Sequence, residues 1–170
     1  MATQQLSGER FTLKTTRSFG DVVGAIERGL AHPNVPELFQ KMKAAPTPAA
    51  LEQVVSAAVG PLGLLEFIRF DFGLVLRKDD PPTNRSAVRF LIGNPLVMRQ
   101  LVRGAPDAGC HAPVSVLVDE RDGAVRITYD RMASLLGAGS DAATFGVARD
   151  LDAKLERLLA SAAGEAVSPS

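Results

Sequence analysis

The segment Gly93-Asn94-Pro95 constrains the fold most, because it separates an extended run from a helical one. Residues 88–92 have the apolar, branched composition of a strand. Glycine lets the backbone turn, asparagine is a favoured helix N-cap, and proline is a favoured first helical residue. Residues 96–103 are therefore expected to form a helix, which a following glycine and proline end. The segment predicts a strand-turn-helix unit.

A β-hairpin is expected directly after this unit. Residues 114–120 and 124–130 both alternate between apolar and polar side chains, and Asp122-Gly123 between them is a strong signal for a two-residue turn. This turn fixes the pairing, so that Val118 faces Ile127 on an apolar face.

The opposite face of the predicted hairpin is polar and carries Ser115, Asp119, Arg126 and Asp130. If the sheet is continuous, Arg69, Asp71 and Arg89 lie on this face as well. A sheet face with so many charges is solvated, covered by another subunit, or the floor of a polar cavity.

The other elements are predicted from periodicity and capping residues. Residues 10–14 alternate as a short strand, and Ser18 with Asp21 forms a capping pair before a helix. Residues 64–77 form the longest strand-like run, in which one face is apolar and is expected to enter the core: Ile68, Phe70, Phe72, Leu74 and Leu76. Ser140 is expected to cap a last helix with the apolar stripe Val147, Ala148, Leu151, Leu155, Leu158 and Leu159.

These elements predict an α+β fold with an antiparallel or mixed sheet covered by helices. Residues 1–163 are expected to form a single domain, with an Ala/Pro-rich helical insertion at about residues 33–63 and a disordered tail at 164–170. Strand, helix and strand follow one another in both halves, which is consistent with a duplication.

Composition excludes several classes of function. The 170 residues contain 19 Lys and Arg and 19 Asp and Glu, so no net charge attracts nucleic acid or an anionic membrane. The first residues lack an apolar core and no run has the length of a transmembrane helix, so a cytoplasmic protein is expected. Cys110 is the only cysteine, which excludes an internal disulfide and a multi-cysteine metal site.

Each candidate site residue has a structural interpretation beside its functional ones. Asn94 caps a helix, or the backbone N–H groups after it hold an anion with Arg89 or Arg99 as a counter-ion. His111, beside Cys110, is a general base, a ligand of a metal or haem iron, or part of an extended approach to a strand. Two histidines and one cysteine are too few for a closed zinc site without carboxylates.

Two further candidates lie on the hairpin. Asp119 forms a cross-strand ion pair with Arg126, or it has an acid–base role. Tyr129, the only tyrosine, lies on the apolar face and is expected in the core with its hydroxyl satisfied, although it is also a candidate ligand-binding residue.

Several of these segments resemble one protein family. They are Gly93-Asn94-Pro95 and its helix, the loop at 106–109, Ala112-Pro113 before an apolar strand, the Asp-Gly hairpin ending in Tyr129-Asp130, and Thr16-Arg17-Ser18-Phe19. Together they resemble the family catalogued as domain of unknown function 302. The resemblance covers the first helix and residues 91–130, whereas residues 32–63 depart from the shorter family pattern. It implies an α+β fold with two similar halves, often dimeric, and it implies no activity.

Three classes of function remain. The first is a module that binds a partly apolar small molecule between the sheet and the helical insertion, with Arg69, Arg89, Asn94 and Tyr129 as binding residues; these groups also suit an anion. The second is a cofactor-independent lyase, isomerase or cyclase that uses Asp71, His111 or Asp119 as acid or base and Arg69 or Arg89 to stabilise an oxyanion. The third is a structural or partner-binding dimer. We favour small-molecule binding by a homodimer, with no cofactor and no resident metal.

Overall fold

The structure is a computed structural model that describes residues 1, 3, 5–79, 85–136 and 140–165. Within these residues five strands form one sheet: β1 (Arg10–Thr15), β2 (Leu65–Asp71), β3 (Ala87–Gly93), β4 (Val114–Arg121) and β5 (Ala124–Asp130). The helices are α1 (Phe19–Arg28), α2 (Val35–Ala44), α3 (Pro48–Ser56), α4 (Gly73–Leu76), α5 (Pro95–Gly104), the 3-10 helix η1 (Pro106–Cys110), α6 (Met132–Leu135) and α7 (Ala142–Ala163). The α+β prediction is confirmed.

All strand pairs in the sheet are antiparallel, in the order β1-β5-β4-β3-β2. The hairpin of β4 and β5 has the predicted register, in which Val118 is opposite Ile127. Its turn residues Asp122 and Gly123 have φ angles of 54° and 71°, the left-handed pair that this turn needs. The local signal of an Asp-Gly turn was therefore sufficient to fix which side chains share a face.

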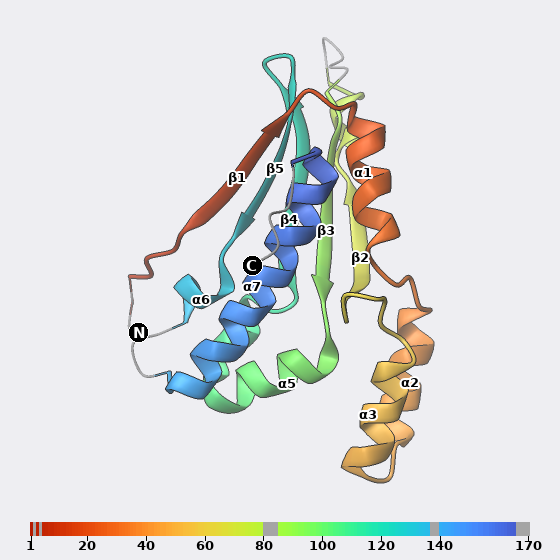
Figure 1. Cartoon of the computed structure of the whole chain (residues 1–170), viewed down its shortest axis with the longest axis vertical. Helices are drawn as coiled ribbons and strands as arrows, with labels where there is room; N and C mark the ends of the chain where they lie inside the picture. Colours follow the sequence, from red (N-terminus) through yellow and green to blue (C-terminus); the bar gives the residue numbers. More distant parts are fainter. Residues whose placement is uncertain (2, 4, 80–84, 137–139, 166–170) are drawn as a thin grey trace.

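Helices α1 and α7 lie on one face of the sheet (Figure 1), where α7 crosses the strands and α1 runs beside it. Alternate residues of the inner strands point into this layer and are fully buried, among them Phe90, Val116 and Ile127. α1 and α5 begin at the predicted caps Ser18 and Asn94, and α2 and α3 begin at Asn34 and Thr47, whose side chains cap them in the same way. The last helix begins one residue later than predicted, because Asp141 rather than Ser140 accepts the N–H of Thr144 (2.7 Å).

The prediction for residues 64–77 was wrong in two respects. The strand ends at Asp71, and Gly73–Leu76 form the short helix α4. In addition, Ile68 and Phe70 are 46% and 40% exposed, so the apolar side chains are on the open face rather than in the core. Because β2 is an edge strand with a register shift between Glu66 and Ile68, its alternation does not reveal which side is covered.

Arg69 and Asp71 consequently lie on the helix side of the sheet and not on the predicted polar face. Arg69 can do so because Glu66 pairs with its Nη2 at 2.7 Å, Glu27 of α1 pairs with its Nη1, and its guanidinium lies 4.7 Å from the ring centroid of Phe90. These carboxylates and the ring together allow a charged side chain to face the core at the edge of the sheet.

The segment expected to be a helical insertion contains α2 and α3, which pack on one another beyond the N-terminal end of β2 (Figure 1). A groove of about 430 Å³ between them is lined by Pro33, Asn34, Glu37, Leu38, Lys41, Gln53, Val54, Ala57 and Ala58. All of these residues lie within residues 33–63. In the predicted tail, residues 166–170 lie outside the described residues. No helix among the described residues has the length and apolar character needed to cross a membrane.

Candidate functional site

The sheet face opposite α1 and α7 contains a concavity of about 510 Å³. Its floor comes from alternate residues of the strands, because antiparallel partners such as Arg89, Leu117 and Thr128 form one row across β3, β4 and β5. Phe72, which follows β2, closes one side and is 40% exposed. The concavity therefore combines an apolar wall with a polar floor.

Four arginines line this concavity, and three of them are paired with carboxylates. Arg10 makes a bidentate pair with Asp130, through Nε to Oδ1 at 2.7 Å and Nη2 to Oδ2 at 2.9 Å. The other two pairs are Arg121 with Asp119 (2.8 Å) and Arg126 with Asp122 (3.2 Å). The predicted ion pair of Asp119 with Arg126 is therefore wrong, because each of these residues pairs with a closer neighbour along the chain.

Arg89 is the fourth arginine and differs from the others. Its Nε donates to the hydroxyl of Ser115 at 2.6 Å, and none of the described carboxylates lies within ion-pair distance of it. A hydroxyl offsets no charge. Arg89 therefore has a guanidinium edge that can bind an anion in the concavity.

Two buried polar atoms on β5 have no hydrogen-bond partner within the described structure. They are Nε of Arg126 and Oγ1 of Thr128, and both residues line the concavity. Leaving a buried donor unpaired costs about 1–3 kcal/mol, so such groups usually have a bound partner. A ligand or a water in the concavity would satisfy them.

Asp130 is held in its charged form at the edge of the concavity. Its hydrogen bonds with Arg10 lower the pKa of Asp130, partial burial opposes this, and the charges of Arg10 and His111 lower it further. Asp130 therefore serves as a fixed negative charge, unsuited to give up a proton at neutral pH.

Of the predicted site residues, Arg89 has its side chain in the concavity. Tyr129 lies on β5, but its ring points to the opposite face of the sheet. Tyr129 is 1% exposed and its hydroxyl donates to Asp152 at 2.9 Å, which confirms the predicted core position and satisfied hydroxyl. Asn94 caps α5 by accepting the N–H of Leu96 at 2.8 Å, and its Nδ2 donates to the carbonyl of Gly63.

The residues suggested as acids or bases are dispersed. Asp71 lies 3.9 Å from Arg77 at the end of β2, and Asp119 is occupied by Arg121. His111 follows η1 and is close enough to Asp130 to influence its pKa. Across the described ranges, no group of three or more His, Cys, Asp and Glu side chains is placed to hold a metal ion.

Sequence reasoning missed a buried carboxylate, Asp152 on α7. It is 6% exposed and accepts the hydroxyl of Tyr129 and the N–H groups of Met132 (2.8 Å) and Ala133 (2.9 Å). Burial raises the pKa of Asp152, although these donors oppose the shift. The available signal was its position four residues after Ala148, inside the apolar stripe of the helix. Its three partners make it an anchor for α6.

Comparisons with known proteins agree with the fold. The family model described as "Domain of unknown function DUF302" matches residues 40–162, which include the hairpin but not α1. The chain is also similar to the solved structure of an uncharacterized conserved DUF302 protein from Bacillus stearothermophilus, with a TM-score of 0.61, 14% identity, and coverage of 91% of this chain and 97% of that one. Among curated proteins, none is significantly similar in sequence. Since the family model spans most of the chain, the protein belongs to the DUF302 family.

Proposed function

We propose that this domain binds a small, partly apolar carboxylate in the concavity on the open face of the sheet. The observation that carries the proposal is Arg89, a charged side chain of the concavity with a neutral partner. A carboxylate matches the guanidinium edge in shape, and two parallel N–H···O bonds fix its orientation.

The local charge favours a ligand with one negative charge. Among the described residues, four arginines face the carboxylates of Asp119, Asp122 and Asp130, which leaves one positive charge uncompensated. A monocarboxylate would offset this charge. A doubly charged group would add repulsion from Asp130 on the same face.

The apolar part of the ligand would contact Phe72 and Leu117. Both line the concavity. Phe72 is 40% exposed, so much of its ring is available to contact a ligand. The unpaired Oγ1 of Thr128 and Nε of Arg126 would bind polar atoms beside the carboxylate. This location replaces the sequence-based expectation of a ligand between sheet and insertion, because the lining of the concavity includes no residue of α2 or α3.

The proposal is tested by calorimetric titration with 3-phenylpropionate and with its uncharged amide. We expect saturable binding of the carboxylate, at least tenfold weaker binding of the amide, and a loss of at least tenfold in Arg89→Gln. Arg99→Gln is the matched control, because Arg99 pairs with Glu52 on the surface away from the concavity. Equal binding of acid and amide, or full binding by Arg89→Gln, would contradict the proposal.

Native mass spectrometry of the protein purified from its own host complements the titrations. A retained carboxylic acid that is absent from Arg89→Gln would identify the natural ligand. Retention of an uncharged or polycationic compound would refute the assignment.

A homodimer is a second proposal, favoured by the apolar side chains beside the concavity. Ile68, Phe70, Leu74 and Val75 are all at least 40% exposed and lie on β2 and α4. A second copy that covers this strip would also enclose the concavity. Light scattering should then give the mass of a dimer for the wild type and the mass of a monomer for Phe70→Ser. A wild-type protein that is still monomeric at high concentration would contradict the homodimer proposal.

A further inference from the structure

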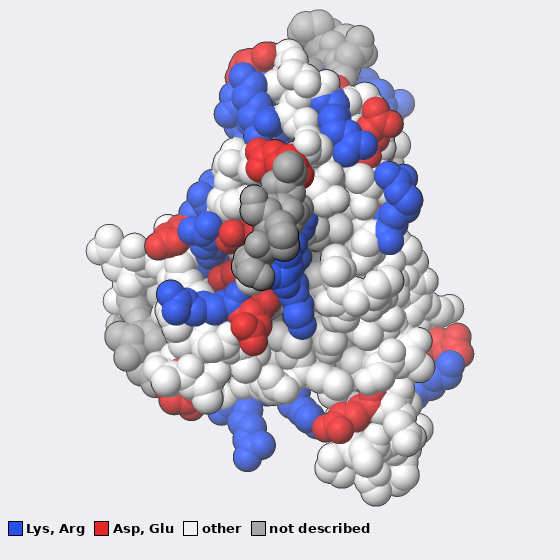
Figure 2. Space-filling view, viewed as in Figure 1, with Lys and Arg blue, Asp and Glu red and all other residues white. Residues whose placement is uncertain are grey.

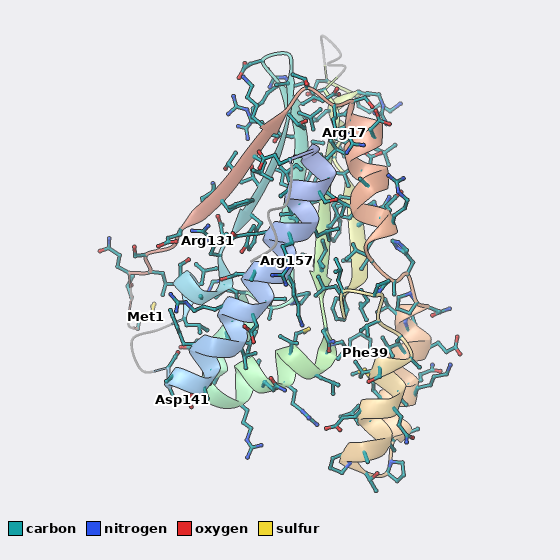
Figure 3. The ribbon with its side chains drawn as sticks, in the orientation of Figure 1. Met1, Arg17, Phe39, Arg131, Asp141 and Arg157 are labelled. Atoms are coloured by element: carbon teal, nitrogen blue, oxygen red, sulfur yellow. The ribbon has the colours of Figure 1, made fainter. Side chains whose placement is uncertain are left out.

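A second candidate binding site lies between α1 and α7, on the face opposite the concavity. The groove there has a volume of about 430 Å³ and its rim carries three arginines: Arg17, Arg28 and Arg157. In Figure 3, Arg17 and Arg157 are labelled on the helix face of the molecule, and in Figure 2 the surface to the right of the grey atoms is mostly neutral, with basic and some acidic side chains at its border. The groove is therefore basic at the rim.

No carboxylate of the described residues lines this groove. Its other lining residues are Ala25, Gly29, Leu62, Leu158 and Ser161, which are neutral. Leu158 is buried at 6% exposure and forms part of the floor, while Leu62 is half-buried. A ligand in the groove would meet an apolar floor below three cationic groups.

None of the three guanidinium groups is paired with a described carboxylate. Arg17 donates to the carbonyls of Ala162 (2.9 Å) and Ser161 (3.4 Å), which orient it at the end of α7 and whose partial negative charge offsets part of its own. Arg28 and Arg157 form no hydrogen bond or ion pair with any described residue. Elsewhere on the surface, arginines such as Arg99 and Arg131 are paired with glutamates.

This arrangement differs from that of isolated surface arginines, which water solvates at little cost. Three like charges around one groove repel one another, and an anion between them would remove this repulsion. A phosphate monoester carries about 1.5 to 2 negative charges at neutral pH and accepts hydrogen bonds from several guanidinium groups at once. Its charge therefore suits this rim better than that of a monocarboxylate.

We propose that the groove between α1 and α7 binds a phosphate monoester, with the phosphate held by Arg28 and Arg157 and the organic part on Leu62 and Leu158. Arg17, positioned by the end of α7, adds the third positive charge, and the hydroxyl of Ser161 is available as a donor. This site is independent of the carboxylate site, because the two share no lining residue. A soluble organic phosphate and the headgroup of phosphatidic acid both have this chemistry.

The experiment is calorimetric titration of the full chain with inorganic phosphate and with phenyl phosphate at constant ionic strength. We expect saturable binding of both, tighter for phenyl phosphate because of the apolar floor, and at least tenfold weaker binding in the double variant Arg28→Gln/Arg157→Gln. Arg103→Gln is the matched control, since Arg103 is exposed, is in the last turn of α5 and lies outside the groove. It should bind as the wild type does.

The source of the phosphate is resolved by co-sedimentation with phosphatidylcholine vesicles that contain or lack phosphatidic acid. Sedimentation that requires phosphatidic acid and is lost in the double variant supports a lipid ligand; binding of phenyl phosphate without sedimentation supports a soluble one. Absence of binding to every probe, or equal binding by wild type and double variant, overturns the proposal. Arg89→Gln should leave phenyl phosphate binding unchanged, so the two sites can fail separately.

Discussion

Tyr129 should remain protonated in the folded protein far above the pH at which a free tyrosine ionises. Burial raises the pKa of its hydroxyl, and the negative charges of Asp152 and Glu156 raise it further. The unfolded chain has a tyrosine pKa of about 10, so the folded value is the higher of the two. Below pH ~10 this group contributes its full stability, and above it the contribution is progressively lost because only the unfolded state releases the proton.

The expected loss can be estimated from one proton. When the unfolded state releases a proton that the folded state retains, the free energy of unfolding falls by about 1.4 kcal/mol per pH unit. Tyr129→Phe should abolish this part of the alkaline decline. At neutral pH the same variant loses the hydrogen bond to Asp152 inside the core, at a cost of about 1–3 kcal/mol.

The assay uses the composition of the chain, which has one tyrosine and no tryptophan. Phenolate absorbance in the near ultraviolet therefore reports on Tyr129 alone, while circular dichroism follows folding in the same samples. Phenolate should form together with unfolding and not before it. A phenolate signal with a midpoint near pH ~10 in protein that is still folded would refute the reasoning.

Three further predictions concern single positions. Thr128→Val should leave thermal stability unchanged or slightly raised while weakening carboxylate binding, because its buried hydroxyl has no partner in the described structure; a clear loss of stability by calorimetry would contradict this. Gly104→Ala should cost about 1–3 kcal/mol in urea unfolding, because the added Cβ meets Thr144 of α7; an unchanged midpoint would exclude the close approach. In NMR titrations the pKa of Asp130 should lie below the ordinary aspartate range and should return toward it in Arg10→Gln, since Arg10 lowers this pKa. The stabilising contribution of Asp130 is therefore lost as the pH falls through its lowered pKa. An Asp130 pKa that is the same in both proteins would disprove the coupling.

Local signals predicted the parts of the fold that depend on a few neighbouring residues. The Asp122-Gly123 turn gave the register of β4 with β5, and Asn94 gave the start of α5, because backbone geometry at these positions is dictated within a few residues. Arg89 was placed correctly on the polar face for the same reason, since its strand lies next to the hairpin.

Features that depend on distant contacts were not predicted. Alternation in β2 showed which side chains share a face but not which face the helices cover, and the partner of Arg69 on α1 is far away in sequence. Phe72 reaches the side of the concavity because the chain turns into α4 directly after β2, and the sequence did not predict this turn. Asp152 was overlooked because its partners come from β5 and α6, and a carboxylate in an apolar stripe has meaning only with those donors in place.

The order of the strands also has a consequence for the time course of folding. β2 to β5 form a meander, in which each strand is next to the following one, so it can assemble from successive antiparallel pairings. β1 leaves the ribosome first but pairs with β5, with Arg10 opposite Asp130, a separation of 120 residues. During synthesis β1 therefore cannot pair until β5 has been made. Pulsed hydrogen exchange should show the amides of β1 gaining protection after those of β4, and simultaneous protection would exclude this order.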